Sequence, residues 1–297
     1  MQELDPGVEP GLALGVSSYE VLAYPPIWRI LAAALVAVSR ASLPAIAVFG
    51  ILLAEESLEL RSLVAAVAIA ALLPGVAAWL IGRAFAAQLD LDAGGVVLRG
   101  RGLRAELPFA SMSRVEPWAV PLPAPGLTLH LHPHRRFGRG LAGATTPSIV
   151  EALVTRASVP GGADPLRRTA VVFAAARAAV SPNVLAHPVA KFVVYALLPT
   201  AVIFNADQWI VYGGTLGQYY AQGLLPYLRS FVLTWFTVSI HLVLYASLWR
   251  GVAELSCWLA ARVAPSHAAR VRRVAEIGCL AGFYAGVPVL LAIRFLS

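Results

Sequence analysis

Charge is scarce in this sequence. Only 13% of the residues are charged, against about 25% in ordinary soluble domains, and 59% are hydrophobic, with a mean hydropathy of +0.72. A water-soluble fold would need far more polar surface, so most of the chain is expected to lie in lipid.

Cysteine and lysine are also rare. The two cysteines, Cys257 and Cys279, lie in apolar helical surroundings, so neither a disulfide framework nor a thiolate metal site is expected. Lys191 is the only lysine among 23 basic residues, which leaves 22 arginines. With abundant Ala, Pro and Gly, this bias indicates a bacterial, GC-rich coding sequence. The first 26 residues are acidic, so no cleavable signal peptide is expected.

Long apolar runs take the place of charge. Crossing a bilayer core takes about 20 apolar residues, and five stretches reach this length: 30–53, 62–82, 190–211, 224–249 and 275–296. The first is interrupted by Arg40 and Pro44, so it is either one kinked helix or two pieces. The fold class predicted is an α-helical polytopic membrane protein.

The basic residues predict the orientation, because cytoplasmic loops carry an excess of Arg and Lys. Those at the helix ends and loops of one side are Arg29, Arg83, Lys191, Arg250, Arg262, Arg270, Arg272 and Arg273. The loops of the other side, 54–61 and 212–222, are acidic or neutral. We therefore expect a bacterial cytoplasmic (inner) membrane protein with its N-terminus inside and its C-terminus outside.

The predicted domain organisation follows from these runs. It comprises an acidic cytoplasmic N-terminus (1–29), a transmembrane hairpin (30–83), a cytoplasmic insert (84–160), an amphipathic interfacial helix (161–188) and a C-terminal membrane domain with three spans (189–297).

The insert has the pattern of a small sheet followed by a helix. Apolar and polar residues alternate over 88–92, 103–109 and 127–132, which is typical of strands with one buried face. Thr146 and Pro147 then form a helix start, with a capping residue before a proline. An apolar stripe of helical spacing continues to about residue 157.

The insert resembles the bacterial PH-like domains of membrane proteins of unknown function. The resemblance covers about residues 86–157 and rests on "LDLDAGGVVLRGRGLRAELPFASMSRVEPW", "GLTLHL" and the helix "PSIVEALV". The proline-rich stretch 117–125 stands where that family has strand. The resemblance implies short antiparallel strands closed by one helix, in a module that docks on lipid headgroups or on a partner protein.

Arginines are the candidate docking residues, since each basic side chain near anionic headgroups contributes about 1 kcal/mol. Those of the insert and the following segment are Arg99, Arg101, Arg104, Arg167 and Arg168. Alternatively, they only enforce topology. Nucleic acid is not expected as a partner, because no stacking aromatics alternate with the basic residues.

No catalytic site is predicted. Glu55, Glu56 and Arg61 invite comparison with the Glu-Glu-x-x-x-Arg motif of intramembrane CAAX-type proteases, but the arginine is one position late, about 100° around a helix. His130 and His132 share a strand face and are weak metal candidates, with no carboxylate or cysteine nearby in sequence.

Four ionisable residues fall inside the predicted spans, where charge is costly and usually paired or functional. They are Arg40, Asp207, Arg229 and His241. Asp207 and Arg229 lie at similar depth and could pair. His241 lacks a second intramembrane histidine, so neither haem nor any other cofactor is expected.

Gly278, Gly282 and Gly286 form a ridge of small residues four apart on the last span. Such ridges let two helices approach closely. The partner is either a helix of this chain or another membrane subunit, including a second copy.

These observations predict a non-enzymatic integral membrane protein, a scaffold or accessory subunit whose insert docks on lipid headgroups or a partner. The alternative is a transporter or channel component that uses the intramembrane polar residues as a path.

Overall fold

The computed structural model describes residues 17–52, 60–92, 94–133, 135–157, 164–181 and 183–296. The chain forms two compact units. The first, the sheet unit, comprises Met1–Ala33 and Trp79–Val171; the second, the helical unit, comprises Ala34–Ala78 and Val172–Ser297.

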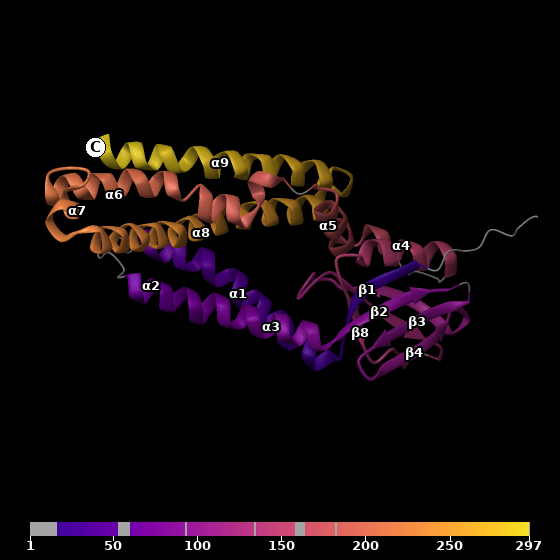
Figure 1. Ribbon diagram of the computed structural model, residues 1–297. Coiled ribbons are helices and arrows are strands. Elements are labelled where there is room, and N and C mark those ends of the chain that lie inside the picture. Colours follow the sequence, from indigo (N-terminus) through magenta and orange to yellow (C-terminus); the bar gives the residue numbers. More distant parts are fainter. Residues whose placement is uncertain are drawn as a thin grey trace, which may run out of the picture. The chain divides into compact units, whose positions relative to one another are not determined.

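The sheet unit is built on an antiparallel sheet (Figure 1). Its strands are β1 (Ser17–Tyr24), β2 (Ala86–Leu91), β3 (Gly95–Gly100), β4 (Leu103–Pro108), β5 (Met112–Pro117), β6 (Gly126–Leu131), β7 (Arg135–Arg136) and β8 (Gly140–Ala142). They follow the spatial order β4-β3-β2-β1-β8-β6-β5, and β7 pairs with β6. The strands expected over 88–92, 103–109 and 127–132 are confirmed as β2, β4 and β6.

Strand β1 was not expected, because its residues were assigned to an acidic tail. It lies in the middle of the sheet, where Tyr19 is opposite Leu89 of β2 and Ala23 is opposite Leu141 of β8. Its pattern nevertheless fits a strand with one inner face, since Val21 and Ala23 are buried and alternate with more exposed residues.

Helix α4 (Thr146–Ala157) covers the core of the sheet unit, as its apolar stripe predicted. Ile149, Val150 and Leu153 are buried among the inner side chains of the strands, including Leu89 and Leu127. Thr146 lies at the start of α4, and its hydroxyl donates to the backbone carbonyls of Pro125 and Gly143.

Within the described residues, five helices are long and apolar enough to cross a membrane: Pro26–Gly50, Leu60–Ala84, Ala190–Tyr212, Leu224–Val263 and Pro265–Ile293. The first belongs to α1 (Pro26–Leu52). The second runs through α2 (Leu60–Val67), the π-helical turn η1 (Ala68–Leu72) and α3 (Leu73–Ala84). The others comprise the π-helical turn η5 (Ala190–Val194) with α6 (Leu197–Tyr212), then α8 (Leu224–Val263), and then α9 (Ala268–Leu296) with the 3₁₀ turn before it.

Helix α1 is continuous through Arg40 and Pro44. Its Ser39 and Ser42 hydroxyls donate to the carbonyls of Ala71 and Ala70, both at 2.8 Å. Those carbonyls belong to the π-helical turn η1, where wider winding weakens the regular ladder and leaves acceptors for a neighbour. The serines beside Arg40 therefore join two helices.

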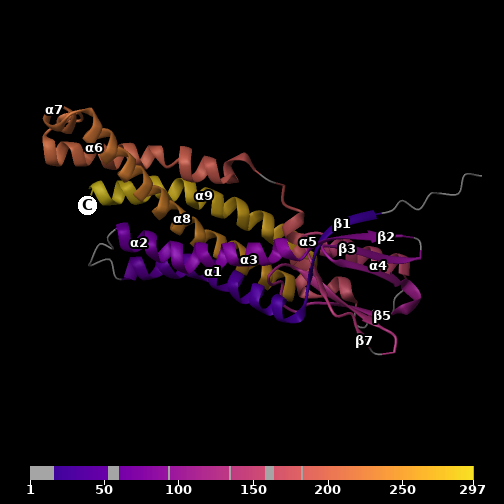
Figure 2. The same cartoon turned by 60° about the horizontal axis from the view of Figure 1, so that its bottom comes forward.

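Helices α6, α8 and α9 run side by side (Figures 1 and 2). Helix α8 has 40 residues, about 60 Å, roughly twice the thickness of a hydrocarbon core. It extends to Val263, beyond the span 224–249 expected from hydropathy.

The segment after α4 differs from the single helix expected between Asp164 and Val180. The 3₁₀ turn Pro165–Arg167 is capped by the Asp164 carboxylate, and α5 (Thr169–Ala178) follows an extended Arg168. Phe173 and Ala176 of α5 are buried against Cys257 and Ala261 of α8. The apolar side chains Phe173 and Ala176 of α5 thus pack against protein.

Candidate functional site

Four charged residues of α8 and α9 form one ion-pair cluster. Arg250 and Glu254 lie one turn apart on α8, and Arg272 and Glu276 one turn apart on α9. The Glu254 carboxylate lies 2.7 Å from Arg250 and 3.2 Å from Arg272. The Glu276 carboxylate pairs with Arg272 and lies 3.4 Å from Arg250. Each carboxylate therefore contacts both arginines and joins the two helices.

Arg272 is the centre of this cluster. Its side chain is only 2% exposed, whereas that of Arg250 is 52% exposed. A buried guanidinium is tolerated only when carboxylates compensate the loss of water, and Glu254 and Glu276 provide this. A third arginine, Arg177 of α5, lies 3.8 Å from Glu254.

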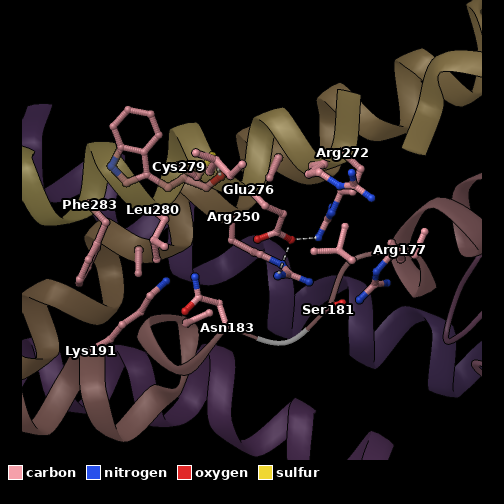
Figure 3. Close-up of a pocket in the computed structure, with 18 residues that line it drawn as sticks. Arg177, Ser181, Asn183, Lys191, Arg250, Arg272, Glu276, Cys279, Leu280 and Phe283 are labelled. Carbon is pink, nitrogen blue, oxygen red and sulfur yellow. Dashed lines mark hydrogen bonds and ion pairs between the residues drawn. The ribbon is translucent and has the colours of Figure 1, made fainter. Parts of the chain in front are cut away.

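A cavity of about 550 Å³ opens beside the cluster and is lined by α5, residues 179–181, residues between 183 and 191, α8 and α9 (Figure 3). We call it the basic cavity. Its basic lining residues are Arg177, Lys191, Arg250, Arg272 and Arg273. Against these five positive charges stand the two carboxylates of Glu254 and Glu276, which leaves a formal surplus of three positive charges.

The surplus charge comes mainly from Lys191 and Arg273, which form no ion pair among the described residues. The Lys191 ammonium lies 5.2 Å from the centre of the Phe283 ring, and Figure 3 shows it beside Asn183 on one side of Arg250. Lys191 sits on the π-helical turn η5, a distortion that is frequent at functional sites.

The pKa of Arg177, which lies outside the five long helices, is lowered chiefly by burial. Arg250, Arg40 and Arg272 lower this pKa further, whereas Glu254 opposes them. Arginine stays protonated all the same. An added anion would relieve this repulsion.

Two buried N–H donors at the cavity have no hydrogen-bond acceptor among the described residues: Nε of Arg272 and the indole Nε1 of Trp249. Both residues line the cavity. Buried donors are normally satisfied, but these atoms have no surface open to the cavity, so its complementarity to an anion comes from the surplus of positive charge.

A second cavity of about 1040 Å³ lies among α1, α2, α6, α8 and α9, and its lining is mostly aliphatic. We call it the apolar cavity. Two of its polar side chains, Thr237 and His241, interact with backbone carbonyls of their own helix. The Thr237 hydroxyl donates to the Leu233 carbonyl, and Nδ1 of His241 lies 2.8 Å from the Thr237 carbonyl. This wall therefore offers a ligand mainly apolar contact.

The four intramembrane polar residues singled out from the sequence do not converge. Arg40, Asp207, Arg229 and His241 are all exposed in the helical unit. Among the described residues no ion pair joins Asp207 to Arg229. Of the four, only His241 lines one of the two cavities.

The three glycines of the ridge on α9 do not have the same neighbours. A Cβ atom at Gly282 would lie 2.7 Å from the Trp249 ring of α8, and one at Gly286 would meet the Tyr245 hydroxyl. Gly278 faces open space. Two of the three glycines thus receive aromatic side chains of the same chain.

The docking arginines of the sheet unit are largely paired with local carboxylates. Arg99 lies 3.6 Å from Asp90, Arg104 lies 2.9 Å from Glu106, and Arg167 lies 3.5 Å from Asp164. Arg101 and Arg168 are exposed and form no ion pair among the described residues. The net positive charge on this unit is therefore smaller than its arginine content indicates.

The two histidines predicted as weak metal candidates have different surroundings. Nε2 of His130 lies 2.7 Å from the Glu116 carboxylate on the neighbouring strand, while His132 is exposed. Burial alone would raise the pKa of Glu116, but the hydrogen bond from His130 and the charge of Arg114 outweigh it and lower that pKa. Within the described residues, no group of three metal-ligating side chains is present. Glu55 and Glu56 lie outside those residues.

The ion-pair cluster was not predicted, because Arg250 and Arg272 were considered as basic residues of one membrane side and never as partners of a glutamate. A signal was present: the pentapeptides "RGVAE" at 250–254 and "RRVAE" at 272–276 are nearly identical. Each places an arginine and a glutamate one turn apart. A repeated pair on two neighbouring helices predicts charges that face each other.

Comparison of the chain with known protein families, with characterised proteins and with solved structures finds no match. The function must therefore be argued from the cavity itself.

Proposed function

We propose that this chain is a non-enzymatic integral membrane protein that holds a ligand with a phosphate or similar oxyanion in the basic cavity. The observation that carries this proposal is the surplus of positive charge around that cavity. Charge-assisted hydrogen bonds from arginine and lysine are the usual means of binding phosphate.

The position of the cavity along the helices supports the proposal. Spanning takes about 20 residues, and the most apolar part of α8 ends near Trp249, where Arg250 and Glu254 begin. The cluster would therefore lie just beyond the hydrocarbon, at the depth of lipid phosphates. By the distribution of arginine, this end is the cytoplasmic one, in a bacterial inner membrane.

In this proposal the sheet unit is a cytoplasmic docking module of PH-like type that holds a partner protein or lipid headgroups. Arg101 and Arg168 are the two docking candidates without an ion pair among the described residues. The chain would thus act as a scaffold or accessory subunit, alone or with further copies. Transport along an intramembrane polar path has less support, because the polar residues of the spans do not converge.

The test is ligand binding by the purified full-length protein in a non-ionic detergent, with glycerol phosphate as the probe. We expect saturable binding that raises the thermal unfolding midpoint. Lys191→Gln should weaken it about 10-fold, because a charged hydrogen bond contributes about 1.5–3 kcal/mol.

Arg229→Gln is the matched control, since it also removes one positive charge from the helical unit but lines neither cavity. Equal weakening by both variants would show general attraction rather than a site. Absence of saturable binding would refute the proposal.

A further inference from the structure

The basic cavity and the apolar cavity are both lined by helices α8 and α9. On α8, Ala246 and Trp249 line the basic cavity, and Tyr245 and Leu248 line the apolar one. The two linings therefore overlap along α8 and occupy different faces of this helix.

On α9 the two linings follow one another along the helix. Leu280 and Phe283 line the basic cavity, and Val287 and Leu291 line the apolar one. These residues are spaced by three or four positions, so they form one stripe on the helix. A ligand following this stripe would pass directly from basic to apolar surroundings.

Aromatic rings mark the boundary. The rings of Phe283 and Tyr245 are stacked, with centroids 5.9 Å apart and an interplanar angle of 28°. The Tyr245 hydroxyl donates to the Gly282 carbonyl, which holds its ring in place. Lys191 lies over the Phe283 ring from the basic side. Charge thus ends, and aliphatic lining begins, within about one helical turn.

The apolar cavity is the larger of the two. The basic cavity has about 550 Å³ and the apolar cavity about 1040 Å³. Ligand pockets are commonly about 300–1,000 Å³, so the apolar cavity has room for a long hydrocarbon group. A free phosphate compound would leave this larger volume without a complementary group.

We propose that the ligand is an anionic phospholipid, with its phosphate in the basic cavity and an acyl chain in the apolar cavity. This inference rests on the proposed function and names the class of its ligand. Charge complementarity favours the phosphate head, and the neighbouring position of the apolar cavity along α9 favours a chain attached to it.

Three matched probes test the proposal on the full-length protein in a non-ionic detergent. Lysophosphatidic acid carries both parts, glycerol phosphate is its head alone, and a monoacylglycerol of the same chain length lacks the phosphate. We expect lysophosphatidic acid to bind at least about 10-fold more tightly than either of the others, as measured by the ligand-dependent rise of the unfolding midpoint.

Two variants separate the cavities. Leu291→Trp fills part of the apolar cavity. It should weaken the binding of lysophosphatidic acid but leave the binding of glycerol phosphate unchanged. Val289→Trp is its control, on an exposed position of the same helix that lines neither cavity. Lys191→Gln should weaken the binding of both lysophosphatidic acid and glycerol phosphate. Because partition into micelles is the same for all variants, differences between them report the site.

The outcomes are distinct. If glycerol phosphate binds as tightly as lysophosphatidic acid, or Leu291→Trp changes neither, the acyl-chain site is overturned and the oxyanion site stands. If the monoacylglycerol binds as tightly as lysophosphatidic acid, the cavity is a general lipid groove and this inference fails. If neither phosphate ligand binds, both proposals fail.

Discussion

The two units of this chain use arginine differently. In the sheet unit, Arg104 and Glu106 pair two positions apart on one strand, with side chains 74% and 62% exposed. In the helical unit, Arg272 is buried and meets Glu254 from another helix and Glu276 from its own. In the sheet unit, an arginine is neutralised by a carboxylate close to it in sequence. In the helical unit, arginines and a lysine from several helices come together, and they outnumber the carboxylates beside them.

The difference shows that arginine content is a poor guide to a binding surface. The 84–188 region holds half of the arginines, yet three of its five candidate docking residues have local carboxylate partners. The basic cavity draws its charges from α5, η5, α8 and α9. Its charge exists only once those helices are assembled.

The largest effect is expected from breaking the buried cluster. Arg272→Ala removes the buried partner of two partly buried carboxylates, so the free energy of unfolding should fall by about 3–5 kcal/mol. Thermal unfolding of the detergent-purified protein measures this. Arg104→Ala, on the exposed pair of the sheet unit, should change it by less than about 0.5 kcal/mol. A similar loss of unfolding free energy in both variants would contradict the difference between the exposed pair of the sheet unit and the buried cluster of the helical unit.

A smaller effect should separate two glycines of one ridge. Gly282→Ala forces a methyl group against the Trp249 ring, whereas Gly278→Ala enters open space. Overpacking costs about 1–3 kcal/mol, and alanine in an open helical position stabilises by up to about 1 kcal/mol. We expect Gly278→Ala to unfold at the higher temperature. The reverse order would show that Gly278 is the buried member, as in contact with a second subunit.

The smallest effect concerns Glu116 in the sheet unit. Its pKa in the folded protein is lowered, so the carboxylate stabilises the fold above the ordinary value of about 4.3. That contribution is lost as the pH falls from about 5 through the folded pKa. Because Glu116 is about one-third exposed, screening limits the effect to about 1 kcal/mol or less.

The measurement is the unfolding midpoint at pH 7 and at pH 3. Glu116→Gln should lose less stability on acidification than the natural chain, since it carries no carboxyl to protonate. His130→Gln should also lose less, because it removes the hydrogen bond that favours the ionised form. An unchanged pH dependence in both variants would show that this cross-strand pair contributes nothing.

Much of the architecture was predictable from local patterns. Runs of about 20 apolar residues predicted the five long helices, and alternation of apolar residues predicted β2, β4 and β6. The end of α8 was not predictable from hydropathy. Residues 250–263 include Arg250, Glu254 and Arg262, which lower their hydropathy, and Cys257 and Ala261 are buried against α5.

The candidate site was less predictable, because its parts are far apart in the chain. Lys191 and Arg273 looked like topology signals when each was considered alone. The repeated Arg-x-Val-Ala-Glu segment was the one local sign that α8 and α9 share an ionic contact.

Composition and periodicity alone established which segments are apolar helices and which are strands, since burial in lipid or in a core imposes its pattern residue by residue. The place of β1 required long-range pairing, because Tyr19 and Leu89 are separated by two apolar helices. The basic cavity required it too. Its positive charges come from four segments of the chain, so the surplus arises only when these segments are packed together.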